Sequence, residues 1–498
     1  MKTRVQATNQ TRCLAMLAAA LIVCATPPAR AQTAEEFKQL KSVVEQMQKT
    51  IDAQNARIAE LEKTRAGQPA ANAPAAVVPV VAAAASPPVH ALAKVAAGQD
   101  VGEQSPVTFR DTFNDQQTGA PRPGSQTLDP KYKGFFPIPN TPAIVKVNAK
   151  PRVDFTDDNR ASGNSDQFVT AQIPTKGTPA YGGGNQFNAN ARGSQLSLDV
   201  RAPELGGAPR FYYEMDFFGG GTTGGMTPRV RHLYGQYYNI IAGFSYSVFE
   251  DPDAWPDTVD YEGPNSAISA RQPEIRYQLP LNDQWQMNFG LEQPSTDLDA
   301  GTHVNATAAN HAPDGGFNVR WERDQAGHVQ FGSIFRALGA NDPVAGNQTV
   351  FGWGLNLAGS FNVWNKDSVQ FQTTYGHGIF HFINDNFINN DVAYDNHNNL
   401  TALPFFGAMA GYTHHWSDRF RSTAAFGYNN LDDQPGQGPL AYHETYYTSL
   451  NVMYQLQKRL TLGIEGLYGL KDVQNGTSGD VFRLQFSVVY TLFPTGTE

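Results

Sequence analysis

Hydrophobic and polar residues alternate with a period of two from about Pro142 to Phe493. The segment 480–493 shows this most clearly, because one face of it carries six large apolar side chains: Phe482, Leu484, Phe486, Val488, Tyr490 and Leu492. The residues between them include Arg483, Gln485, Ser487 and Thr491. Successive side chains of a β-strand point to opposite faces. The pattern therefore predicts strands with one apolar and one polar face.

The alternation recurs in sixteen segments, near 142–156, 194–204, 210–218, 229–239, 240–250, 273–281, 285–294, 316–324, 328–338, 350–364, 367–383, 403–417, 419–431, 441–457, 460–472 and 480–493. Many are longer than the roughly five or six residues of an average strand, and they suit a tilted crossing of an apolar band of about 25 Å. Short turns such as 457–459 separate some of them, and long polar loops such as 384–402 separate others. We therefore predict an all-β fold for 134–498, a transmembrane antiparallel β-barrel of about 16 strands with a water-filled lumen.

Two of these segments are irregular. Pro151 has no backbone N–H to donate to a ladder, so we expect the segment 142–156 to bend there. In the segment 229–239, Arg229, Arg231, Leu233 and Tyr237 share one parity. We interpret this segment as a strand that lines a subunit interface instead of lipid.

The N-terminus has the features of an export signal. Three basic residues precede an apolar core at 14–25, and Ala29-Arg30-Ala31 has the form of a cleavage site. We predict a signal peptide at 1–31. Lipoprotein processing at Cys24 is the alternative, which Val23 before it disfavours. Both cysteines lie in this signal, so the predicted mature chain has no disulfide and no thiol chemistry.

The region after the signal divides into a helix and a linker. In the predicted coiled-coil helix at 32–65, the heptad a positions are Phe37, Val44, Ile51 and Ile58, and the d positions are Leu40, Met47, Gln54 and Leu61. These eight residues are the predicted oligomerisation seam, in which Gln54 could set the register. The alternative is a single amphipathic helix packed on its own barrel. Residues 66–133 are rich in Ala and Pro, and we predict a largely disordered linker.

Composition narrows the classes of function. Charged residues make up only 17% of the chain, while Gly, Phe and Tyr are abundant, which suits many strands joined by turns. Removal of the signal takes away four basic residues and leaves 33 basic against 46 acidic, a net charge of about −13. Such an acidic chain is a poor partner for nucleic acid.

The signals that suggest an enzyme are weak. His377 and His381 have the spacing of a helical metal pair, but in a strand they would lie roughly 13 Å apart. The glycines at 219–221 precede no helix that could hold a phosphate. We therefore predict no catalytic residue, no metal site and no cofactor.

Several sequence blocks are similar to one known family. The stretches GFFPIPNTPAIVKVNAKPRVDF (134–155), MDFFGGG (215–221), RVRHLYGQYYNIIAG (229–243) and FEDPDAWPDTVDYEGPNSAISARQPEIRY (249–277) resemble the DcaP-type trimeric outer-membrane porins. The pair Lys150-Pro151 departs from this pattern, because the family tends to have glycine and an aromatic residue there. The resemblance implies a trimer in the bacterial outer membrane, surrounded by lipid, with a periplasmic coiled coil and a channel for small polar or anionic solutes such as dicarboxylates.

The loop 250–266 is the candidate to fold into the lumen and set selectivity. It carries six acids and no base: Glu250, Asp251, Asp253, Asp257, Asp260 and Glu262. The candidate opposing bases are Arg271 and Arg276 after the loop and Arg152, Arg192, Arg201, Arg210, Arg229, Arg231 and Arg320 on the wall. Opposed rows of charge narrow a pore and orient polar solutes, and arginine suits the capture of a carboxylate.

The sign of the selectivity stays open at this point. Acids that face the lumen would favour cations. Acids that pair with wall arginines, or that point into a subunit interface, would leave the remaining arginines to favour anions, and the resemblance supports anions. A third interpretation is that the acids only tie the loop to the wall. The alternative function is a structural barrel whose coiled coil tethers it to the cell wall or to a partner protein.

Overall fold

The computed structural model describes residues 135–221, 225–323, 326–364, 366–388 and 390–492. The chain divides into two units, Met1–Val95 and Ala96–Glu498, and all described residues belong to the second. The predicted signal peptide, coiled coil and linker lie outside the described residues. Among the residues that are described, no helix is long and apolar enough to cross a bilayer.

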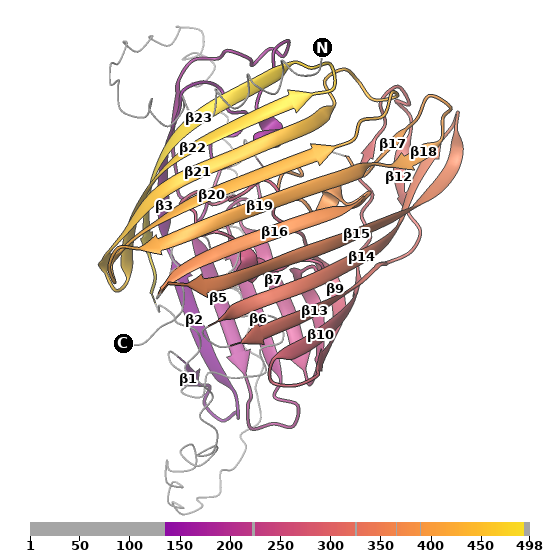
Figure 1. Ribbon diagram of the computed structural model, residues 1–498. Coiled ribbons are helices and arrows are strands. Elements are labelled where there is room, and N and C mark those ends of the chain that lie inside the picture. Colours follow the sequence, from indigo (N-terminus) through magenta and orange to yellow (C-terminus); the bar gives the residue numbers. More distant parts are fainter. Residues whose placement is uncertain (1–134, 222–224, 324–325, 365, 389, 493–498) are drawn as a thin grey trace, which may run out of the picture. The chain divides into compact units, whose positions relative to one another are not determined.

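Twenty strands of the described residues form one sheet (Figure 1). They are β1 (Phe136–Pro137), β2 (Ile144–Lys150), β3 (Arg152–Asp158), β4 (Gln186–Asn190), β5 (Gln195–Arg201), β6 (Arg210–Asp216), β7 (Arg229–Tyr237), β8 (Ile240–Tyr246), β9 (Arg271–Pro280), β10 (Trp285–Glu292), β12 (Thr307–Asn310), β13 (Asp314–Arg323), β14 (Gly327–Asp342), β15 (Gly346–Val363), β16 (Asp367–His377), β19 (Pro404–His415), β20 (Phe420–Leu431), β21 (Tyr442–Gln457), β22 (Leu460–Val473) and β23 (Ser478–Tyr490). A smaller sheet holds β11 (Leu298–Asp299), β17 (Val392–Tyr394) and β18 (Leu400–Ala402). Three short 3₁₀ helices are η3 (Thr170–Gln172), η4 (Pro252–Ala254) and η5 (Phe380–Phe382).

The large sheet closes on itself as an antiparallel barrel. Strand β23 pairs with β3 from Val489↔Arg152 to Arg483↔Asp158, and this pairing joins the last strand to the first. If β2 and β3 count as one strand, β4 and β5 as another, and the short β1 and β12 are set aside, the described residues form sixteen barrel strands. The predicted fold class is confirmed.

The first barrel strand is interrupted at Pro151, as the sequence predicts. Strand β2 before it pairs with β5, whereas β3 after it pairs with β4 and β23. The carbonyl of Pro151 still accepts a hydrogen bond from the Tyr490 N–H at 3.0 Å. The proline thus removes one hydrogen-bond donor from the junction of the first and last strands without opening the barrel.

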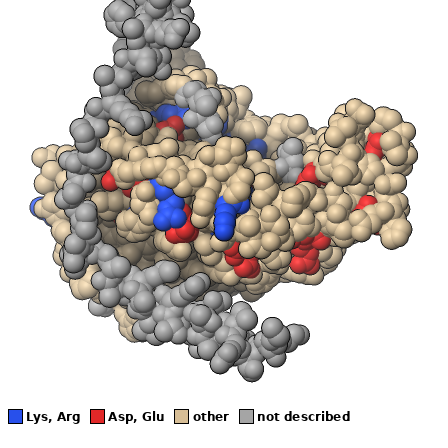
Figure 2. Space-filling model, turned by 90° about the horizontal axis from the view of Figure 1, so that it is seen from above, with Lys and Arg blue, Asp and Glu red and all other residues tan. Residues whose placement is uncertain are grey.

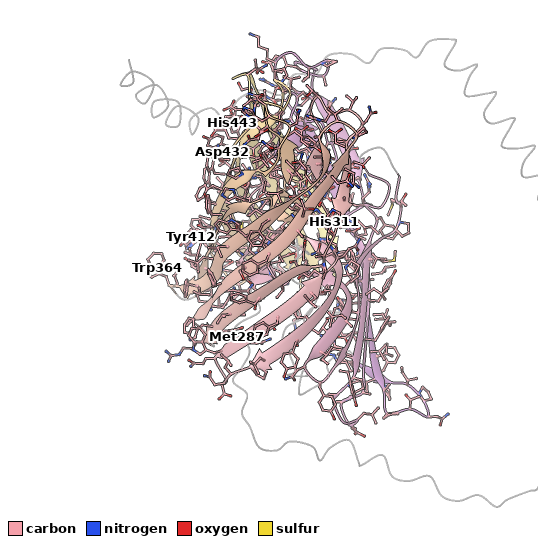
Figure 3. All side chains as sticks on the ribbon, turned by 90° about the vertical axis from the view of Figure 1, so that its right-hand side faces the viewer. Met287, His311, Trp364, Tyr412, Asp432 and His443 are labelled. Atoms are coloured by element: carbon pink, nitrogen blue, oxygen red, sulfur yellow. The ribbon has the colours of Figure 1, made fainter. Side chains whose placement is uncertain are left out.

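The two faces of the wall have opposite polarity. On β23, Phe482, Leu484 and Phe486 are exposed on the outside, while Arg483 and Gln485 are buried inside. At one rim aromatic side chains project outward, with Trp364 78% exposed and lying 6.4 Å from the ring of Tyr412 (Figure 3). An apolar outer band with aromatic residues at its edges is typical of an outer-membrane barrel.

The poor alternation of β7 has a local cause. Arg231 and His232 are adjacent in the chain, yet both are buried, and the pairing of β6 with β7 shifts register between Glu214 and Met215. A β-bulge of this kind inserts one residue and reverses the parity of the residues after it. The strand therefore keeps an outward face that includes Val230 and Leu233. The bulge accounts for the irregular pattern of this segment, and the subunit interface along it stays a prediction.

Two predicted strands end at least four residues earlier than expected. Strand β8 ends at Tyr246, not at 250, and β16 ends at His377, not at 383. After β16, Gly378 adopts a φ of +68°, and the chain turns into the barrel interior. A Cβ on Gly378 would lie 2.2 Å from Cδ1 of Leu338, so this sharp turn requires glycine.

Candidate functional site in the barrel interior

Residues 247–270, here called the first inward segment, run between β8 and β9 along the inside of the wall, and nearly all of them are buried. Wall amides hold its carbonyls: Asn318 on β13 donates to Val248 at 2.7 Å, and Asn451 on β21 donates to Asp257 at 2.9 Å. Hydrogen bonds from distant strands thus fix the path of the segment around the lumen. This segment includes the predicted loop 250–266.

Three of its six acids pair with bases on the wall. Arg320 on β13 donates to Asp251 and to Asp253, each at 2.9 Å. Arg421 on β20 donates to Asp257 at 2.6 Å, and both of these side chains are buried. Each of these three carboxylates therefore contacts a guanidinium, and two positive charges face three negative ones.

The other three acids have raised pKa values, and burial is the main cause in each case. The pKa of Glu250 lies well above its ordinary value. The pKa of Asp260 is raised to about 6, and that of Glu262 to about 8, where the neighbouring charge of Asp260 adds to the effect. The Glu262 carboxyl also contacts the amide of Gln167. Glu262 thus favours the neutral form at pH 7.

Most wall arginines are paired as well. The pairs and their distances are Arg152–Asp154 (2.8 Å), Arg201–Asp199 (2.7 Å), Arg210–Asp199 (3.0 Å), Arg229–Asp216 (2.6 Å), Arg231–Glu214 (2.7 Å) and Arg276–Glu274 (2.8 Å), and Arg192 pairs with Asp166. A space-filling view from above shows few charged side chains among uncharged ones, with basic groups beside acidic ones near the middle and acidic patches without a basic neighbour on the right (Figure 2).

Arg271, at the start of β9, differs from these. It forms no ion pair with any described residue, and its Nε is buried without a hydrogen-bond partner. The guanidinium lies over the ring of Tyr246, 5.4 Å from the centroid. Arg271 is therefore a lumen-side cation whose charge no carboxylate neutralises by direct contact.

A cavity of about 230 Å³ lies beside Arg271. It is lined by Gln167, Arg229, Glu262, Ser269, Ala270, Arg271, His381, Ile383, Asn384, Asn386 and Phe387. Of the predicted pore residues, Arg229, Glu262 and Arg271 line this cavity. The others do not: Glu250, Asp251, Asp253, Asp257, Asp260, Arg276, Arg201, Arg210, Arg152, Arg192, Arg231 and Arg320.

Much of this lining comes from residues 378–388 and 390–391, here called the second inward segment, which we did not predict from the sequence. It follows β16 and includes η5, whose Phe380 and Phe382 are buried in the main hydrophobic cluster. Ile379 and Ile383 keep the parity of the apolar residues of β16, so the segment resembles a strand in the sequence. The signals against a strand were the glycines at 376 and 378 and the large apolar Phe380 and Phe382, which fall on the parity that is polar in β16.

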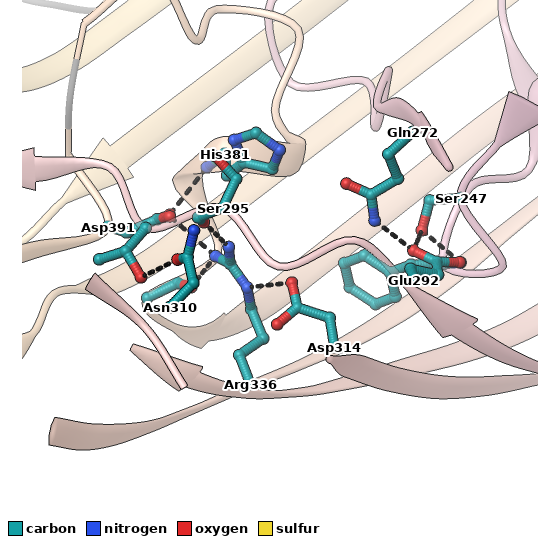
Figure 4. A network of polar contacts seen from close by, with 12 residues as sticks. Ser247, Gln272, Glu292, Ser295, Asn310, Asp314, Arg336, His381 and Asp391 are labelled. Carbon is teal, nitrogen blue, oxygen red and sulfur yellow. Dashed lines mark hydrogen bonds and ion pairs between the residues drawn. The ribbon is translucent and has the colours of Figure 1, made fainter. Parts of the chain in front are cut away.

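One group of side chains has the spacing of a metal site. Ligand atoms of Asp297, His381 and Asp391 lie within 4.8 Å of one another. However, Arg336 donates to Asp391 at 2.8 Å (Figure 4). Asn386 donates to Asp297 at 3.0 Å. Asp391 is therefore already paired with a guanidinium, and Asp297 already accepts a hydrogen bond from an amide.

Comparisons with known proteins agree with this architecture. Residues 133–492 match the model of the DcaP outer membrane protein family. The outer membrane channel DcaP of Acinetobacter baumannii has 20% sequence identity and a TM-score of 0.64, with coverage of 70% of this chain and 97% of that one. OprB of Pseudomonas putida has 11% identity and a TM-score of 0.46, with coverage of 70% and 94%. An anion-selective porin from Comamonas acidovorans has 12% identity and a TM-score of 0.44, with coverage of 70% and 100%. No curated protein sequence matches the chain.

Proposed function

Because this chain belongs to the DcaP outer membrane protein family and is a porin of the bacterial outer membrane, we propose that its channel passively admits small polar solutes and prefers anions. Dicarboxylates are the proposed solute class. The observation that carries the preference for anions is the charge around the 230 Å³ cavity.

The lining of the cavity combines two arginines with one acid. Arg271 has no carboxylate partner among the described residues, and Arg229 shares Asp216 with Arg231. The acid is Glu262, whose pKa of about 8 keeps it mostly protonated at pH 7. The lining is therefore net positive at neutral pH, and a positive constriction lowers the electrostatic barrier for anions.

The polar lining also suits a carboxylate. Arginine can present two parallel N–H donors to the two oxygens of a carboxylate. Ser269, Asn384 and Asn386 add uncharged polar groups around the same space. A solute with two carboxylates could keep contact with one arginine while it approaches the other.

For the assembly we propose a homotrimer, with each barrel facing outer-membrane lipid on its apolar side. The predicted heptad of 32–65 would join the three chains in the periplasm, through the seam of Phe37, Leu40, Val44, Met47, Ile51, Gln54, Ile58 and Leu61. Contact of this coiled coil with the cell wall is a further proposal.

Single-channel recording of the purified mature protein in a planar bilayer tests the function. Under a KCl gradient, we expect current steps in groups of three, a reversal potential that indicates anion selectivity, and retained current when succinate replaces chloride. Cation selectivity would overturn the preference for anions and assign the constriction to the acids Asp251, Asp253 and Asp257. No conductance from folded, heat-modifiable protein would overturn conduction itself.

The alternative is a structural barrel that acts through its coiled coil. It is favoured by one observation, which is that inward segments occupy much of the barrel interior. Deletion of residues 32–130 separates the two functions. We expect conductance to survive the deletion. A silent barrel together with a cell-envelope defect that follows the coiled coil would support the structural role instead.

A further inference from the structure

The second inward segment is held at its two ends by one arginine. Arg336 on β14 is buried, and its Nη1 donates to the Gly378 carbonyl at 2.6 Å and to Asp391 at 2.8 Å. Its Nε donates to Asp314 at 2.9 Å (Figure 4). The entry and exit of the segment therefore share a single anchor on the wall.

The middle of the segment is held by Asp385. Its carboxylate accepts hydrogen bonds from Thr170 Oγ1 at 2.8 Å, Ala171 N at 2.7 Å, Tyr442 Oη at 3.0 Å and Thr445 Oγ1 at 2.8 Å. Two of these donors belong to the loop between β3 and β4, and two belong to β21. Asp385 thus connects three separate parts of the chain through one buried side chain.

The segment also packs directly on the first inward segment. Asn384 N donates to the Ala267 carbonyl at 2.8 Å, and Ser269 N donates to the Phe382 carbonyl at 2.9 Å. Ile268 and Ile383 form an isolated antiparallel bridge. The two segments therefore meet edge to edge, next to Arg271.

We propose that the second inward segment is a second constriction element of this channel and that Asp385 is the residue that positions it. Five of the eleven residues that line the cavity come from this segment, namely His381, Ile383, Asn384, Asn386 and Phe387. These five residues form one side of the cavity. A solute in the cavity would face this side together with the wall arginines Arg229 and Arg271. If the link at Asp385 is lost, this side moves and the opening widens.

The proposal rests on conduction through the barrel and not on the preference for anions. Unit conductance and current noise report the width and steadiness of the constriction, whereas the reversal potential reports its charge. A wild-type channel that selects cations would therefore overturn the proposed function and leave this inference intact.

The first test is recording from the Asp385→Ala variant. We expect a higher unit conductance and more current noise than in the wild type, from protein that is still heat-modifiable. Asp283→Ala, at an exposed turn between β9 and β10, is the matched control and should behave as the wild type. A folded Asp385→Ala variant with wild-type conductance and noise would overturn the proposal.

A cross-link tests whether the effect comes from the position of the segment. Bridged antiparallel residues have Cα atoms about 4.5–5.5 Å apart, within the range of about 4.4–6.8 Å that a disulfide needs. We expect Ile268→Cys/Ile383→Cys in the Asp385→Ala background to restore wild-type conductance when oxidised and to lose it again on reduction. If the oxidised protein shows confirmed cross-linking but no rescue, Asp385 does not act by positioning the segment.

A third test does not depend on the folding of the Asp385 variant. Phe387 is 38% exposed and lines the cavity, and the predicted mature chain has no cysteine of its own. Modification of a Phe387→Cys variant with a bulky charged thiosulfonate should lower the conductance sharply. Val344→Cys, at a position 80% exposed beyond the end of β14, is the control and should be insensitive. Unchanged current after complete labelling of the Phe387→Cys variant would overturn the proposal.

Discussion

Arg421 on β20 donates from Nε to the carboxylate of Asp257 at 2.6 Å, and neither side chain is more than 2% exposed. The two residues are 164 positions apart in the chain. This contact ties the first inward segment to the far part of the wall and removes one acid from the candidate permeation path.

We expect Arg421→Gln to destabilise the protein, because it leaves Asp257 buried without its cation. The loss of one partner of a buried pair costs about 3–5 kcal/mol. Thermal unfolding in detergent, followed by the heat-modifiable shift on a gel, measures the change. The double variant Arg421→Gln/Asp257→Asn should be more stable than Arg421→Gln alone, since no unpaired charge remains. Equal stability of the single variant and the wild type would contradict the expectation.

Arg271→Gln should weaken the preference for anions without closing the channel. A unit charge at about 4 Å in a water-like dielectric contributes about 1 kcal/mol, or about five-fold in the ratio of anion to cation permeability. The reversal potential under a KCl gradient measures this ratio. Arg323→Gln, an exposed position at the end of β13, controls for the loss of a positive charge elsewhere. A ratio that does not change in Arg271→Gln would remove this residue from the path.

The preference for anions should fall as the pH rises through about 8. The pKa of Glu262 is raised to about 8 from an ordinary value of 4.5, so its carboxyl is neutral below that pH and adds a negative charge to the cavity above it. The reversal potential between pH 6 and pH 10 measures the transition. Glu262→Gln should keep the preference of the low-pH wild type over this whole range. A wild-type reversal potential that does not depend on pH would contradict the expectation.

The same shift has a consequence for stability. Because the folded pKa of Glu262 lies above its unfolded value, the stabilisation from its neutral form is fully present below about pH 4.5. It is lost as the pH rises toward 8. Unfolding temperatures of the wild type should therefore decline over this window relative to those of Glu262→Gln.

Gly378→Ala and Gly346→Ala form a matched pair, because both glycines have positive φ angles, +68° and +77°. A Cβ at 378 would meet Leu338 Cδ1 at 2.2 Å, whereas one at 346 would have no neighbour within 4 Å. Both changes impose backbone strain of roughly 1–2 kcal/mol, but only Gly378→Ala adds a clash. We expect Gly378→Ala to unfold at a clearly lower temperature and to be cut by protease within 378–391. Equal behaviour of the two variants would show that the turn at 378 relaxes without cost.

The wall of the barrel could be predicted from the sequence because its periodicity is local. Each strand buries every second residue, and even the bend at Pro151 follows from the missing N–H of one residue. The bulge at Arg231 and His232 was not foreseen, since a single inserted residue gives the same irregular pattern as a change of environment.

The interior was less predictable because its contacts join residues far apart in the chain. The loop 250–266 stands out by its acids and prolines. Of its partners, Arg320 was among the candidate wall bases and Arg421 was not, and neither could be assigned to particular acids. The second inward segment was hidden, because Ile379 and Ile383 keep the parity of the apolar residues in the strand before them. The left-handed turn at Gly378 separates the segment from β16.

The first inward segment takes hydrogen bonds from strands around the wall, as far as Gln485 on β23, which donates to the Val259 carbonyl. That partner lies 226 residues further along the chain, and contacts between such distant residues form late because closing the intervening loop costs entropy. The hydrogen bonds that hold this segment are therefore complete only when β23, the last strand of the barrel, is present. The lining of the lumen and the closure of the wall thus both depend on the final strand of the chain.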